Sequence, residues 1–247
     1  MSTDQISNLF SANGSLGDRF VAHLAREIVR GRYAVGADLP AETAFSLQFG
    51  ISKPIVRQGI RALAALGLVR IHHGKRTVVL GEGSWNVLDP VVHEAFAAAG
   101  RATELSGDLW ALREVLEGAA AGWAADRATP AQSAKLLGIA QELAVFARIG
   151  DIGRFLETDQ AFHNLVYAVA GNVALAQVSR PVHRFLSAQL WSPSSQVQPD
   201  KLEQLALQHL KVAEAIGAHD GVEARRAMTE HIVYARDIEM SRPDARQ

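Results

Sequence analysis

Apolar residues recur at helical spacing after a polar, aperiodic segment, residues 1–15. Each of the first periodic stretches ends at a glycine. Ser52 followed by Pro54 is typical of a helix start, because serine caps free backbone N–H groups and proline has no N–H to lose. Two β-branched runs follow and predict an antiparallel hairpin. The predicted elements are helices over 16–30, 42–49 and 52–66, and strands over 68–71 and 77–80.

This order of elements predicts a winged helix-turn-helix over residues 16–80, preceded by a flexible tail, and a Gly-Glu-Gly-Ser run then predicts a linker over 81–88. Beyond it the spacing is helical throughout, so an all-α antiparallel bundle is expected over 89–247. The fold is therefore predicted to be mainly α with a small β-hairpin wing. The helices of the bundle are predicted over 89–99, 105–126, 130–148, 152–170, 173–191, 201–218 and 221–241.

The net charge of −1 hides an asymmetry between the two predicted domains. Residues 16–80 contain ten Lys or Arg against four Asp or Glu, whereas residues 81–247 contain fifteen against twenty-one. A basic module joined to an acidic one indicates that only the first approaches a polyanion. Clustering by chance would give the same totals, so charge alone does not decide the function.

The composition also limits the class of protein. The chain has no cysteine, which excludes disulfides and thiolate metal ligands. No stretch approaches the ~18 apolar residues that a membrane-spanning helix needs, and residues 1–15 lack the basic-then-apolar order of a signal peptide. We therefore expect a cytoplasmic protein with no membrane partner.

The helix that begins at Ser52 has two different faces. Its apolar stripe is formed by Val56, Ile60 and Leu63. Its basic face contains Lys53, Arg57 and Arg61, one every fourth residue. In a major groove, arginine can donate two parallel hydrogen bonds to guanine, while lysine and hydroxyl groups can bind phosphates. The alternative is an ordinary amphipathic helix with a solvated basic face.

The tip of the predicted hairpin favours DNA binding. Glycine adds no side chain, so the backbone can come close to a second groove, and the neighbouring cations suit phosphates or a narrow minor groove. The tip residues are His73, Gly74, Lys75 and Arg76.

The stretch from Leu39 to Val79 resembles the winged helix-turn-helix of the GntR family of bacterial regulators. It contains, in order, Pro-x-Glu, a short helix, Ser-x-x-x-Val-Arg, Leu-x-x-x-Gly-Leu-Val and a glycine-tipped wing. The family usually has arginine after Pro-x-Glu, and here that residue is Thr43. A DNA contact is therefore expected to be weakened or lost, and the family's operator preference is not carried over. The resemblance implies DNA contacts from Ser52, Lys53, Arg57, His73 and Gly74.

Three histidines and one aspartate are predicted to point inward from three helices of the bundle. Asp159 and His163 are one helical turn apart on an apolar face, and His209 and His231 lie on the apolar stripes of their own helices. A buried Asp is costly unless it is paired. A single such histidine is more often a satisfied core residue, but this combination predicts a site for a divalent transition metal, zinc or nickel above others. The four histidines without such placement are expected to be structural, and His72 is expected to be exposed beside the wing; the four are His23, His93, His183 and His219.

This pattern resembles the effector domain of the FadR-type branch of the GntR family, with Leu-Arg-x-x-Leu-Glu at 112–117 and Asp-x-x-x-His at 159–163. In metal-binding members of that branch the matching Asp and three His residues hold a divalent metal. The acyl-binding founder lacks this arrangement, so the resemblance argues against an acyl-CoA effector. The segment Trp85–Pro90 resembles the linker of sugar-acid-responsive members.

A metal with four protein ligands retains open positions that a small carboxylate could fill. Arg113 is the candidate to bind that carboxylate further, and the alternative is a structural pair with Glu117. The sequence thus predicts a homodimeric repressor that binds operator DNA and responds to a small carboxylate. A metal-responsive regulator is the alternative. A metal-dependent enzyme is a weaker one, because no residue fits a general base beyond the ligands.

Overall fold

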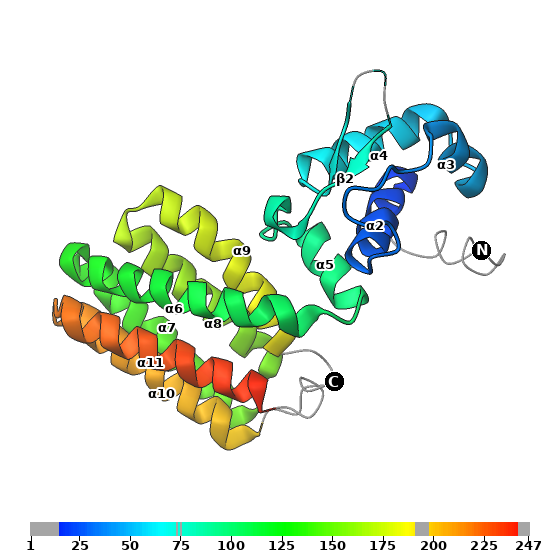
Figure 1. The fold of residues 1–247 in the computed structure, drawn as a ribbon. Coiled ribbons are helices and arrows are strands. Elements are labelled where there is room, and N and C mark those ends of the chain that lie inside the picture. The colour runs from blue at the N-terminus through cyan, green and yellow to red at the C-terminus, as the bar shows by residue number, and fades with distance from the viewer. Residues whose placement is uncertain (1–14, 73, 75, 191–197, 242–247) are drawn as a thin grey trace. The chain divides into compact units, whose positions relative to one another are not determined.

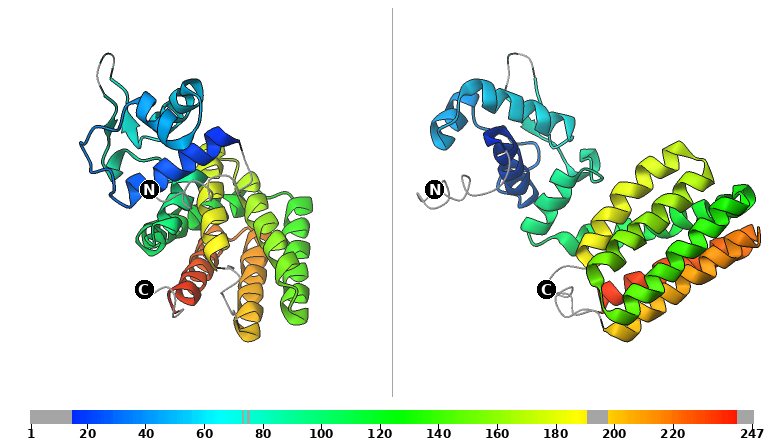
Figure 2. Two further views of the ribbon diagram at one scale, coloured as in Figure 1. Left: turned by 90° about the vertical axis from the view of Figure 1, so that its right-hand side faces the viewer. Right: turned by 180° about the vertical axis from the view of Figure 1, so that it is seen from behind.

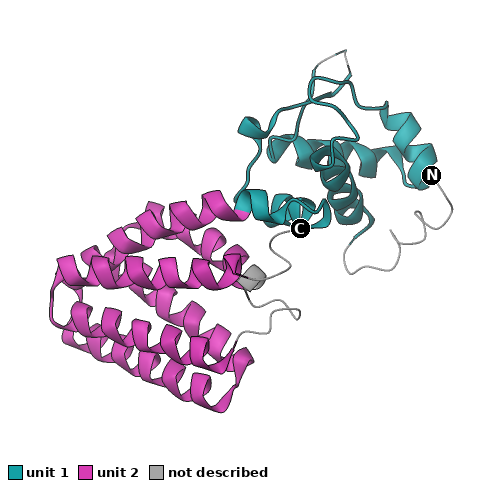
Figure 3. Cartoon of the chain, turned by 60° about the horizontal axis from the view of Figure 1, so that its bottom comes forward, with its two compact units in different colours: residues 1–105 teal, residues 106–247 magenta. Residues whose placement is uncertain are grey.

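The computed structural model describes residues 15–72, 74, 76–190 and 198–241. The chain divides into two compact units, residues 1–105 and 106–247 (Figure 3). Helices dominate both units, and a two-stranded antiparallel sheet lies in the first (Figure 1). The mainly α fold is therefore confirmed. The elements are α2 (Leu16–Val29), α3 (Glu42–Phe49), α4 (Lys53–Ala65), β1 (Val69–Arg70), β2 (Val78–Val79), η1 (Glu82–Ser84), α5 (Pro90–Ala98), α6 (Ala102–Arg127), α7 (Pro130–Ile149), α8 (Ile152–Ala170), α9 (Val173–Leu190), α10 (Pro199–Gly217) and α11 (Gly221–Met240).

The first unit has an aromatic core beneath its helix-turn-helix. Phe20 of α2 meets Phe45 and Phe49 of α3 edge to face, with ring centroids 5.6 and 5.5 Å apart. Helix α4 comes so close to α2 that a Cβ added at Gly59 would lie 2.5 Å from the Phe20 ring. Strands β1 and β2 pair in antiparallel register and form the base of the predicted wing.

Residues 81–88, which the sequence predicts as a linker, lie within the first compact unit, and Trp85 anchors them there. Trp85 is buried, its indole N–H donates to the Leu80 carbonyl at 3.0 Å, and its ring meets Phe96 of α5. Gly67 has φ +73°, and a Cβ there would lie 1.9 Å from the Ser84 carbonyl oxygen, so the close approach requires glycine. The compact units divide only after Leu105, whereas the functional domain boundaries stay a prediction.

The second unit is a bundle of long helices. Helix α10 packs against α7 and α11, and α7 also packs against α8 (Figures 1 and 2). Thr129 begins α7 with a capping box, in which its hydroxyl accepts from the Gln132 N–H while the Gln132 side chain accepts from the Thr129 N–H. Gly150 and Gly171, both left-handed, end α7 and α8. Among the described residues, no helix has the length and apolar content that crossing a membrane requires.

Candidate metal centre and DNA-binding face

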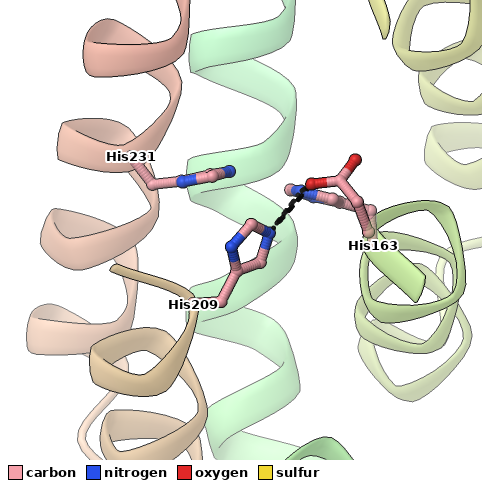
Figure 4. A group of neighbouring side chains, drawn as sticks. His163, His209 and His231 are labelled. Atoms are coloured by element: carbon pink, nitrogen blue, oxygen red, sulfur yellow. Dashed lines mark hydrogen bonds and ion pairs between the residues drawn. The ribbon is translucent and has the colours of Figure 1, made fainter. Parts of the chain in front are cut away.

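Four side chains predicted as metal ligands meet inside the second unit. Asp159 and His163 come from α8, His209 from α10 and His231 from α11, and all four are buried. One ligand atom of each lies within 4.8 Å of the others. The three imidazole rings point towards one another, as Figure 4 shows. The structure thus brings together residues that are up to 72 positions apart in the chain.

The hydrogen bond of His209 fixes which of its nitrogens is free. Its Nδ1 lies 2.8 Å from the Leu205 carbonyl oxygen, which can only accept, so Nδ1 bears the proton in the neutral ring. The lone pair of Nε2 then faces Oδ1 of Asp159 at 3.1 Å and Nε2 of His163 at 3.3 Å.

His163 has the same arrangement. Its Nδ1 lies 2.5 Å from Oε2 of Glu117, and this contact with a carboxylate favours the tautomer with the proton on Nδ1 and Nε2 unprotonated. That Nε2 faces Oδ1 of Asp159 at 3.8 Å. Burial lowers the pKa of His163 to about 4, so the ring is neutral at pH 7.

With His209 neutral, lone pairs of Asp159, His163 and His209 face one another in a buried space, where Nη2 of Arg113 also lies 3.4 Å from Nε2 of His163. Acceptors facing each other without a proton repel, and burial in a low dielectric makes that repulsion costly. A cation at their centre removes the repulsion. Histidine ligands whose second nitrogen donates to a carboxylate or a carbonyl are the usual surroundings of a bound metal. The donor set of three imidazoles and one carboxylate fits a transition metal.

His183 of α9 belongs to this cluster, although the sequence predicted a structural role for it. Its Nε2 lies 3.3 Å from Oδ2 of Asp159, the oxygen opposite the one that faces His209, and its Nδ1 lies 3.7 Å from Oε1 of Glu117. The two contacts orient Asp159 and link it to Glu117. Its buried neighbours on α9, Val182 and Leu186, were the signal in the sequence that could have placed it inward.

Arg113 and Glu117 of α6 form a buried ion pair beside the four ligands. Nε of Arg113 donates to Oε1 of Glu117 at 2.6 Å, and the Tyr167 hydroxyl donates to the same oxygen at 2.7 Å. Burial raises the pKa of Glu117, but the charge of Arg113 and the contacts with His163 and His183 together lower it more, so that it lies well below its usual value. The pair with Glu117 is therefore present. Nη2 of Arg113 also lies 3.4 Å from Nε2 of His163, so the guanidinium reaches the four ligands. Binding of an effector by Arg113 stays a prediction.

Other histidines lie away from this cluster. His23 packs against the Phe49 ring in the first unit, with centroids 5.2 Å apart. Nδ1 of His219 lies 2.7 Å from the Ala125 carbonyl oxygen, at the turn between α10 and α11. Both have the structural roles that the sequence indicated.

The predicted DNA-binding residues of α4 lie on its solvent face. Its apolar stripe of Val56, Ile60 and Leu63 is buried in the first unit. Ser52 occupies the N-cap position, but its side chain makes no capping hydrogen bond, which leaves the hydroxyl available. Arg57 forms an ion pair with Glu42 of α3 at 2.9 Å, a contact that the sequence did not predict. The exposed residues on this face are Ser52, Lys53, Arg57 and Arg61.

Two of the four predicted wing residues, His73 and Lys75, lie outside the described residues. Gly74 has φ +70°, a left-handed conformation that glycine adopts without strain, and it is exposed together with Arg76. Their contacts to DNA stay a prediction.

The helix-turn-helix elements of the first unit and the helical bundle of the second are together typical of a DNA-binding regulator. Residues 16–79 match the family model of bacterial regulatory proteins, gntR family, and residues 108–234 match that of the FCD domain. The chain belongs to the GntR family of transcriptional regulators with an FCD domain. Both family models and the relatives described next are of transcriptional regulators, not of enzymes.

Individual relatives agree with this assignment. The chain is 29% identical to the galactonate operon transcriptional repressor of Escherichia coli K12, over 85% of this chain and 90% of that protein. It is 27% identical to the transcriptional repressor NanR of an Enterobacter species, over 90% of this chain and 84% of that protein. Among solved structures it is similar to Lar, which controls the Listeria monocytogenes agr system, with a TM-score of 0.59 and 17% identity over 92% of this chain and 99% of that one.

Proposed function

We propose that this regulator is a cytoplasmic repressor whose affinity for operator DNA is controlled by a small carboxylate bound at a divalent metal. The observation that supports this best is the buried approach of Oδ1 of Asp159, Nε2 of His163 and Nε2 of His209, which are all acceptors when both rings are neutral. With His231 they would hold zinc or nickel. A metal of this kind supplies a Lewis-acidic centre for an anionic oxygen.

The carboxylate is the effector class that the surrounding charges favour. Four protein ligands leave coordination positions free on a metal that accepts five or six. Arg113 is a buried cation whose Nη2 already lies 3.4 Å from His163, so it is placed to bind an anion at the metal. One relative represses a galactonate operon, and galactonate is a sugar acid. We therefore infer a sugar acid as the effector.

For DNA binding we propose the face of α4 and the tip of the wing. Lys53, Arg57 and Arg61 are exposed at helical spacing and suit a major groove. The wing, with Gly74 at its tip, suits an adjacent groove. The proposed set is Ser52, Lys53, Arg57, Arg61, His73, Gly74, Lys75 and Arg76.

The test is to measure binding to a duplex that the protein itself selects from a random-sequence library, while metal and acid are varied separately. We expect zinc or nickel alone to leave affinity nearly unchanged, and galactonate or gluconate to weaken binding of the metal-loaded protein. Arg113→Lys should reduce the response to the acid while metal content is kept, because lysine retains the charge but loses the planar fork. If metal alone changes the affinity for DNA as much as metal and acid together, the protein is a metal-responsive regulator and the acid is not its effector.

We also propose that the regulator works as a homodimer, since two modules on a near-palindrome multiply the affinity of one. Leu112 and Val115 are exposed apolar residues one turn apart on α6, with Val115 69% exposed, and they suit the contact. Val115→Glu is expected to shift the protein from dimer to monomer in analytical ultracentrifugation. Val222→Glu, at the start of α11 where the valine is 83% exposed, is the control and should leave the dimer intact. A Val115→Glu protein that remains dimeric would move the interface elsewhere.

A further inference from the structure

Glu42 is the acidic residue of the α3–α4 surface, and it is bound to the central arginine of the proposed DNA face. Its carboxylate accepts hydrogen bonds from the side-on edge of the Arg57 guanidinium, the edge formed by Nε and Nη2. Nε lies 3.2 and 3.1 Å from the two carboxylate oxygens, and Nη2 lies 2.9 Å from Oε2. Among the described residues, Nη1 of Arg57 has no acceptor in contact. The guanidinium is thus fixed along one edge and open along the other.

The position of Glu42 is unusual for a surface that meets a polyanion. The hydrogen bond from Arg57 lowers the pKa of Glu42, and the nearby charges of Arg57, Arg61 and Lys53 lower it further, so the carboxylate is ionised at neutral pH. A negative charge among these cations repels phosphates and reduces binding to any DNA sequence. A residue with this cost for affinity is expected to contribute to something other than affinity.

We propose that Glu42 is a positioning residue for base recognition, holding Arg57 so that the end-on edge of its guanidinium is presented to guanine. A guanidinium has five N–H donors, and the contact with Glu42 uses the Nε and one of the Nη2 donors. The end-on pair, one N–H from Nη1 and one from Nη2, remains and matches the O6 and N7 acceptors of guanine in the major groove. This inference rests on the proposed DNA-binding role of α4.

The ion pair also affects how Arg57 divides its contacts between bases and phosphates. A free arginine side chain samples many rotamers and can bind phosphates of any sequence, whereas a fixed one has already lost that freedom. Glu42 therefore lowers the affinity for DNA of any sequence and raises the discrimination at one base pair. Removing its charge should move the two quantities in opposite directions, which a purely structural role would not do.

The experiment uses the full-length protein and duplexes that the wild type selects from a random-sequence library. Affinity is measured for the selected duplex, for single G→A replacements in it, and for an unrelated duplex, at several salt concentrations. Glu42→Gln is expected to bind the unrelated duplex several-fold more tightly with a steeper salt dependence, and to lose about 10-fold of the discrimination at one guanine. Arg57→Ala should lose the discrimination at the same guanine.

The double variant Glu42→Gln/Arg57→Ala decides whether the two act together, because Glu42→Gln should cost no further discrimination once Arg57 is gone. Glu104→Gln is the matched control. Glu104 is another exposed glutamate that binds an arginine, Arg101, along the same side-on edge, and its loss should leave DNA discrimination unchanged.

Two results would overturn the inference, and they are distinguishable. Should Glu42→Gln keep full discrimination and only lower the melting temperature, Glu42 stabilises the α3–α4 pair and does not position Arg57 for recognition. Should Arg57→Ala itself keep the selected affinity and discrimination, then α4 does not read the bases through this arginine. In that case both the proposed DNA face and the role of Glu42 are wrong.

Discussion

Replacing His209 by alanine is expected to reduce the bound metal from about one ion per chain to a small fraction, and to lower the melting temperature of the protein. The wild-type ring presents Nε2 to the other ligands because the Leu205 carbonyl holds the proton on Nδ1. Its loss removes one of four ligands and leaves Asp159 and His163 as buried, facing acceptors. Since the metal binds only the folded protein, weaker binding also means lower stability. Metal analysis after dialysis and calorimetry measure the two effects.

His231→Ala also removes a ligand and should lower metal content and melting temperature in the same way. A substitution further from the metal should have a smaller effect on both. Glu117→Gln removes the charge that orients His163 without removing a ligand, so a weakening of metal affinity by about 10- to 100-fold is expected. His219→Asn is the control. His219 lies in the turn that joins α10 to α11, outside the cluster, and asparagine tolerates its positive φ of 57°. Unchanged metal content in both His209→Ala and His231→Ala would show that the four side chains are not the ligands.

Much of the helical framework could be predicted from the sequence because its signals are local. A threonine and proline mark the start of α7, and Gly150 and Gly171 mark the ends of α7 and α8, each through the backbone conformation of one or two residues. The inward orientation of Asp159 and His163 follows from their spacing on a single helix. Such features need no knowledge of what packs against the helix.

Contacts between helices could not be predicted in the same way. His183 meets Asp159 and Glu117, residues of two other helices, and periodicity gives the face of a helix but not the side chains that it meets. The packing of Trp85 has a similar cause, because its hydrogen bond to Leu80 and its contact with Phe96 depend on tertiary structure. The glycine-rich run before Trp85 therefore gave no sign that this side chain is packed. The pair of Glu42 with Arg57 joins two helices and was missed for the same reason.

Operator DNA and the effector are expected to weaken each other's binding by the same factor, about 100-fold. The candidate site and the DNA-binding residues are on different compact units, so an effector can act on DNA binding only through a change in the protein. Helix α6 is where we expect this change to begin, since it bears Arg113 and Glu117 and its first residues belong to the first unit. A 100-fold coupling requires only ~2.7 kcal/mol.

Thermodynamic linkage makes this expectation strict, because the cycle of free, DNA-bound, effector-bound and doubly bound protein must close. Calorimetric titration of the metal-loaded protein with galactonate, with and without a saturating amount of the selected duplex, measures one side of the cycle. Titration with the duplex, with and without galactonate, measures the other. Arg113→Lys serves as the comparison, since a weakened acid contact should shrink both shifts together. Equal affinity for the acid in the presence and absence of DNA would mean that the metal centre is a structural feature of the bundle and that its ligand does not regulate DNA binding.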